Sequence, residues 1–99
     1  MADAMTRPQQ IAIALGDVLT AEALHERLMT ALNFPNFYGY NWDAFWDAIT
    51  GLVAMPHVLR LEGWQQLATR LPAEARVLQS LLTQMQALYP HRAPRLELA

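Results

Sequence analysis

Two aspartates, Asp43 and Asp47, stand four residues apart in a stretch of the chain that carries no basic residue. On a helix this spacing places both carboxylates on adjacent turns of one face, where like charges repel by roughly 0.2–0.5 kcal/mol. A helix that served stability alone would gain from a basic residue at one of the two positions. Carboxylates accept charge-assisted hydrogen bonds from arginine, lysine or histidine. The pair is therefore a candidate for binding the cationic groups of a partner.

The stretch around these acids is rich in aromatic rings. Residues 34–52 read FPNFYGYNWDAFWDAITGL and hold seven of the nine aromatic residues of the chain. In a helix over 42–50, Trp46 falls at the border between the acidic face and an apolar face. A tryptophan flanked by charges is typical of binding hot spots. The alternative is that both acids have no role in binding. Asp43, in the first turn, can interact favourably with the helix dipole, and Asp47 can be an ordinary solvated side chain.

The loop before this helix contributes further polar and aromatic groups. Asn41 is the expected N-cap, and Gly51 is the expected stop at the other end of the helix. Gly39, between Tyr38 and Tyr40, is expected to let the backbone turn with a positive φ. The loop and the helix together therefore form one candidate patch for binding a protein.

Composition excludes several classes of protein. The chain has 99 residues, enough for one domain, and 54% of them are hydrophobic. It has no cysteine and hence no disulfide framework, and no apolar run is long enough for a membrane span. Its net charge of −2, with no lysine, lacks the basic stripe of a nucleic-acid binder. Residues 1–62 carry most of the acids, which favours a cationic partner. A cytoplasmic location is the default expectation.

The sequence offers no catalytic or cofactor site. The three histidines, His25, His57 and His91, are scattered and show no metal-ligand spacing. No glycine-rich phosphate loop is present. Asp43 and Asp47 as a dyad with His57 would lack the pocket that raises the pKa of a catalytic acid. We therefore predict no metal, no cofactor and no enzymatic activity.

The elements that position these residues alternate between strand and helix. Apolar β-branched runs predict strands, and the first of them reads as a buried strand. Amphipathic stripes closed by proline or glycine predict helices. The pattern is typical of an α/β fold, with a small three-stranded, mainly parallel sheet packed by three to four helices. We expect a frayed N-terminus over 1–8 and a single domain over 9–99, with strands at 10–15, 57–62 and 95–99 and helices at 21–33, 42–50, 64–70 and 73–89.

The segment YGYNWDAFWDAITG resembles the barstar family, the intracellular inhibitors of barnase-type ribonucleases. The pattern Y-G-x-N-x-D-A-x-W-D-x-x-T-G is kept, and the similarity runs over about residues 23–64 and weakly to the C-terminus. The resemblance implies a three-stranded parallel sheet packed by helices. It also implies inhibition by charge mimicry, in which carboxylates of the second helix take the places of RNA phosphates in the cleft of the ribonuclease.

The resemblance assigns roles by position. Asp47 would be the central acid that enters the phosphate site, and Asp43 the flanking acid. The residues that would frame them or lie near the contact rim are Trp46, Tyr38, Tyr40, Asn41, Phe37, Gly39, Thr50 and Gly51.

The chain departs from the family pattern at four places. Phe37 replaces a tyrosine, Tyr40 an acid and Leu52 a tryptophan, and the acid of the last long helix aligns near Thr83 or Gln84. The acidic patch is therefore smaller. The implied partner is a ribonuclease or nuclease toxin with a basic cleft, bound by a monomer. The alternative is a diverged interaction module with a non-nuclease partner.

Overall fold

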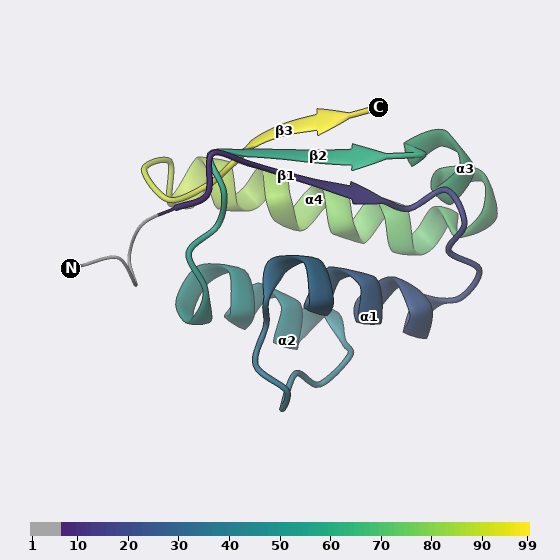
Figure 1. The fold of residues 1–99 in the computed structure, drawn as a ribbon, viewed down its shortest axis with the longest axis horizontal. Coiled ribbons are helices and arrows are strands. Elements are labelled where there is room, and N and C mark those ends of the chain that lie inside the picture. The colour runs from purple at the N-terminus through teal and green to yellow at the C-terminus, as the bar shows by residue number, and fades with distance from the viewer. Residues whose placement is uncertain (1–6) are drawn as a thin grey trace.

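The computed structural model describes residues 7–99 (Figure 1). Strands and helices alternate along the chain, as the sequence predicts. The elements are β1 (Gln10–Ala14), α1 (Ala21–Leu32), α2 (Trp42–Asp47), the π-helical turn η2 (Ala48–Leu52), β2 (Val58–Glu62), α3 (Trp64–Arg70), α4 (Pro72–Leu88) and β3 (Arg95–Leu98).

The three strands form one parallel sheet in the order β1-β2-β3. Ile11 aligns with Leu59, and Leu59 aligns with Leu96. Parallel neighbours need a crossover connection, and the helices supply it on each passage between strands. The predicted fold class is thus confirmed, an α/β domain with a small three-stranded parallel sheet and four α-helices.

The helices α1, α2 and α4 all lie on the same side of the sheet (Figure 1). The inward side chains Ile13, Leu59 and Leu61 are buried, whereas Ala12 and Ala14 on the outer face of β1 are exposed. The prediction of a buried first strand is therefore correct for one face only, because β1 is an edge strand that helices cover on one side.

Ion pairs cover the open face of the sheet. Arg60 on the central strand lies 3.2 Å from Glu62 and 3.4 Å from Glu97, and Arg95 lies 2.9 Å from Glu97. Alternating charges of this kind keep a sheet face and its edges soluble.

The apolar face of α2 packs into the core. Phe45 is fully buried, and its ring centroid lies 5.3 Å from that of Trp42 and 5.8 Å from that of Phe34. Ala48 and Ile49 are also buried. The helical periodicity predicted this face, and its burial fixes which way the opposite, acidic face points.

The chain before β1 is held to the loops at the same end of the sheet. Arg7 donates hydrogen bonds to the carbonyl oxygens of Met55, Pro56, His91 and Ala93, at 2.7–3.2 Å. The carbonyl oxygen of Pro8 accepts from the amide of His57 at 2.9 Å. We predicted a frayed terminus over residues 1–8, and residues 1–6 of this segment lie outside the described residues. Arg7 and Pro8 are bonded into the domain.

Candidate functional site

The acidic helix begins at a well-formed cap. Asn41 has extended backbone angles, and its side-chain oxygen accepts a hydrogen bond from the amide of Ala44 at 2.7 Å. Its side-chain nitrogen donates to the carbonyl oxygen of Gly39 at 3.1 Å. The predicted N-cap is therefore confirmed. The same side chain joins the loop to the first turn of α2, so it fixes where the helix starts.

The loop turns at a different residue from the one predicted. Positive φ occurs at Tyr40, at 55°, and not at Gly39. A Cβ at Gly39 would lie 3.1 Å from the side-chain nitrogen of Asn41 and 3.5 Å from the Cβ of Ala44. Glycine thus serves a close approach to the cap rather than a left-handed turn. Tyr40 adopts a conformation that costs a non-glycine residue free energy, and such residues cluster at functional sites.

A buried polar cluster supports the loop and α2 from below. His25 of α1 is only 3% exposed, and its Nδ1 lies 2.5 Å from the hydroxyl oxygen of Tyr38. The ring of Trp42 lies 4.3 Å from that of His25, between centroids, and its Nε1 donates to Glu74 of α4 at 2.9 Å. Through these contacts α1 and α4 hold the loop and the first turn of α2 in place.

Protonation states in this cluster follow from its burial. Burial lowers the pKa of His25, and the nearby carboxylate of Glu74 opposes this by a smaller amount. Burial also raises the pKa of the Tyr38 hydroxyl, with the neighbouring Tyr40 adding to the rise. The neutral forms of both groups are favoured at neutral pH.

A pH dependence of stability follows from the lowered pKa of His25. The unfolded chain binds a proton at this residue near pH 6.5, whereas the folded protein binds it only at a lower pH. Because the unfolded state then holds more protons, the free energy of unfolding is expected to fall as the pH drops below about 6.5. Urea unfolding between pH 8 and pH 5 measures this loss. In His25→Gln the slope should largely vanish, and equal slopes in both proteins would contradict the assignment.

The two carboxylates lie on the exposed face of α2. Asp43 and Asp47 are both exposed. The ion pairs found within residues 7–99 are Arg27–Asp17, Arg60–Glu62, Arg60–Glu97 and Arg95–Glu97. None of them involves Asp43 or Asp47. Each therefore presents a carboxylate with open acceptor sites to a partner.

The aromatic residues of the predicted patch divide into two groups. Phe37 is 73% exposed, and Trp46 is half-buried with its ring 6.3 Å from that of Tyr89. Tyr38, by contrast, is only 8% exposed and belongs to the buried cluster. Tyr40 is half-buried. Phe37 is thus the most accessible ring of the predicted patch, whereas Tyr38 acts mainly by positioning the loop.

The far end of the helix widens into a π-helical turn. The amide of Val53 donates to the carbonyl oxygen of Ala48, five residues back, at 3.2 Å. The helical segment therefore continues to Leu52, one residue past the predicted stop at Gly51. The side chain of Thr50 donates to the carbonyl oxygen of Trp46 at 2.6 Å. Such turns are rare and often occur at functional sites.

Gly51 has no structural need to be a glycine. It is exposed, its φ is not positive, and a Cβ there would meet nothing within 4 Å. Glycine inside a helix costs roughly 0.5–1 kcal/mol relative to alanine. The absence of a side chain thus leaves the backbone bare at the end of the acidic face, where another molecule can approach closely.

Two residues at this end were not predicted from the sequence. Arg92 donates to the carbonyl oxygen of Thr50. Tyr89, beyond the end of α4, lies beside Trp46. Both come from a loop more than 35 residues away along the chain, so no local spacing signals the contact. No group of three or more His, Asp or Glu residues within 7–99 can hold a metal ion.

The structure is that of a small α/β domain that presents two carboxylates on one exposed helix face. The chain matches the family described as "Barstar (barnase inhibitor)" over residues 9–98, and it belongs to this family. The family consists of inhibitors rather than enzymes. Across the described part of the chain, no helix is both long and apolar enough to cross a membrane.

One curated relative carries a related name. The protein named "Putative ribonuclease inhibitor YrdF", from Bacillus subtilis (strain 168), is 43% identical to this chain over 49 residues. The alignment covers 50% of this chain and 54% of the relative, so the chain spans about half the length of that protein.

Proposed function

We propose that this protein is a cytoplasmic inhibitor, or immunity protein, that binds a ribonuclease one to one and blocks its active site. A monomer would insert α2 and the preceding loop into the basic cleft of the ribonuclease. The observation that carries the proposal is the pair Asp43 and Asp47, exposed on a helix whose other face is anchored in the core. An inhibitor of this kind would neutralise a ribonuclease toxin before it reaches RNA inside the cell.

The chemistry of a ribonuclease cleft explains why carboxylates suit it. Such a cleft binds the phosphates of RNA through arginine, lysine and histidine. Carboxylates form charge-assisted hydrogen bonds with the same groups and also raise the association rate. Asp47 would be the central acid and Asp43 the flanking one.

Further residues supply contact rather than charge. Phe37 and Trp46 offer apolar area beside the acids, and Gly51 offers bare backbone at the rim. Gly39 and Asn41 fix the loop and the helix start. Tyr38, Tyr40 and Thr50 complete the surface or hold it in shape.

Inhibition kinetics test the proposal. Barnase is the probe, because the family to which this chain belongs is that of the barnase inhibitor. Its hydrolysis of RNA is measured at increasing concentrations of this protein and of substrate. We expect inhibition that ends at one molar equivalent and is competitive with RNA. Full barnase activity in the presence of a large excess of the protein would count against a barnase-type partner.

A further inference from the structure

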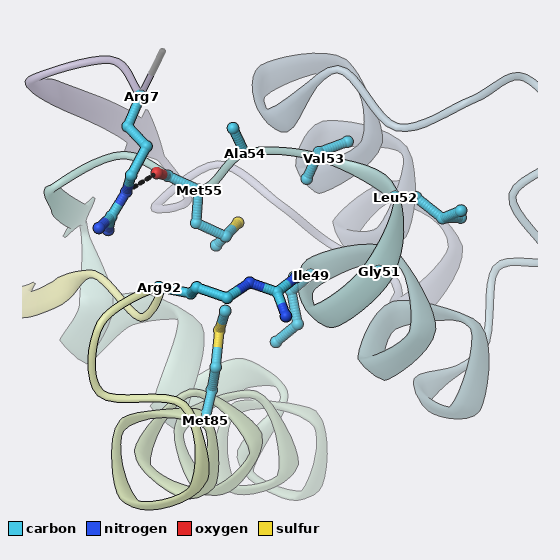
Figure 2. A pocket seen from close by; sticks show the side chains of 9 residues that line it. All are labelled: Arg7, Ile49, Gly51, Leu52, Val53, Ala54, Met55, Met85 and Arg92. Carbon is cyan, nitrogen blue, oxygen red and sulfur yellow. Dashed lines mark hydrogen bonds between the residues drawn. The ribbon is translucent and has the colours of Figure 1, made fainter. Parts of the chain in front are cut away.

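The positively charged side chain of Arg92 lies at the end of the helix face that carries Asp43 and Asp47. Arg92 lies in the loop between α4 and β3, and it is exposed. Its guanidinium donates to the carbonyl oxygen of Thr50, and its Cζ lies 5.6 Å from the ring centroid of Tyr89. Figure 2 shows this side chain reaching from the loop toward Ile49 and Gly51. The contact therefore ties Arg92 to the surface that we propose meets the ribonuclease.

This charge has no acidic partner within residues 7–99. The ion pairs of the described chain involve Arg27, Arg60 and Arg95, and not Arg92. Hydrogen bonding to a carbonyl oxygen satisfies a donor but leaves the positive charge unneutralised. As far as residues 7–99 are concerned, the guanidinium of Arg92 thus has remaining donors, and its charge, with which to meet another group.

A pocket opens beside Arg92. It has a volume of about 300 Å³ and is lined by the apolar side chains Ile49, Val53, Met55 and Met85, with Arg7 on a second wall (Figure 2). The four hydrogen bonds of Arg7 go to carbonyl oxygens, and no acid among residues 7–99 forms an ion pair with it. A cavity of this size has room for a carboxylate side chain between two cations.

Arg92 is close enough to the acids to alter what they recognise. Thr50 follows Asp47 by three residues, which is a rise of roughly 4.5 Å along a helix. The surface is therefore bipolar, with two negative charges along α2 and a positive charge at the end of η2. A partner cleft that is basic throughout would be attracted by one end and repelled by the other.

We propose that Arg92 determines specificity by receiving an acidic side chain from the border of the partner's cleft. This inference rests on the proposed function and narrows the partner class. The matching ribonuclease combines a basic cleft, which takes Asp43 and Asp47, with a carboxylate that enters the pocket beside Arg92. Ribonucleases with basic groups at that border are disfavoured. Arg92 thereby discriminates between ribonucleases that Asp43 and Asp47 alone would bind equally well.

Charge variants of both proteins test the proposal, with barnase as the probe. Inhibition constants are measured at low and high salt for wild type, Arg92→Gln and Arg92→Glu. At low salt, Arg92→Glu should change the inhibition constant for barnase roughly tenfold, with Arg92→Gln between it and wild type. Binding weakens if an acidic side chain of barnase faces Arg92 and tightens if a basic one does. The change should shrink at high salt. Arg95→Gln on the outer face of the sheet is the matched control and should change little.

A charge-reversal scan of barnase then locates the contact. At one position bordering the barnase cleft, a glutamate should favour binding to wild type over Arg92→Glu, and a basic residue should favour binding to Arg92→Glu.

The proposal is overturned if Arg92→Gln and Arg92→Glu inhibit as well as wild type at low salt, or if the change is insensitive to salt. A role limited to capping the helix predicts that outcome, together with a loss of stability. Failure of the proposed function looks different, because then neither wild type nor the Arg92 variants would inhibit barnase.

Discussion

Replacing Asp47 with alanine is expected to weaken binding to the ribonuclease by at least about 2 kcal/mol, roughly 30-fold in the dissociation constant. The carboxylate is exposed and absent from the ion pairs of residues 7–99, so its removal leaves the fold intact. In the complex, by contrast, the basic groups of the cleft would be left desolvated without a partner, and that cost is large. Inhibition constants and urea unfolding of the same variant separate the two effects.

Two comparisons sharpen this result. Asp17→Ala removes another exposed acid, one that pairs with Arg27 at 3.0 Å outside the proposed site, and should leave inhibition unchanged. Asp43→Ala should weaken binding less than Asp47→Ala does. Binding of Asp47→Ala as tight as that of wild type would show that the central acid is wrongly assigned.

Phe45→Ala is expected to reduce the free energy of unfolding by about 3–5 kcal/mol. The ring is fully buried on the core-facing side of α2, where it packs against Phe34 and Trp42, so its removal leaves a cavity in the core. Loss of this anchor also loosens the helix that carries both carboxylates. Chemical denaturation measures the change.

Phe37→Ala is the matched control for this variant. The same ring is lost, but Phe37 is 73% exposed, so the free energy of unfolding should change by less than about 0.5 kcal/mol. Inhibition should nevertheless weaken, because the ring belongs to the proposed contact surface. A large loss of stability in Phe37→Ala, or none in Phe45→Ala, would contradict the packing described above.

Local patterns predicted the architecture well. The strands, the N-cap at Asn41 and the buried face of α2 all follow from spacings within a few residues of one another. Those signals are short-range because caps and helix faces depend on neighbours one turn away. The acidic face could likewise be predicted, since Asp43 and Asp47 share one helix.

Contacts between distant segments could not be predicted in this way. His25 was one of three scattered histidines in the sequence, yet it joins Tyr38 and Trp42 in a buried cluster. The bond from Arg92 to Thr50 spans 42 positions. The prediction of a positive φ at Gly39 was wrong. The left-handed conformation occurs at Tyr40, and the missing side chain of Gly39 instead leaves room for the cap residue Asn41.

Displacement of a nucleotide from the cleft is the most direct test of charge mimicry. Barnase is loaded with a fluorescent mononucleotide phosphate, and this protein is added in steps. If Asp47 and Asp43 take the phosphate positions, the nucleotide leaves at one equivalent, and a higher nucleotide concentration weakens the apparent binding of the protein. A ternary complex in which barnase holds both the nucleotide and the protein would contradict the account.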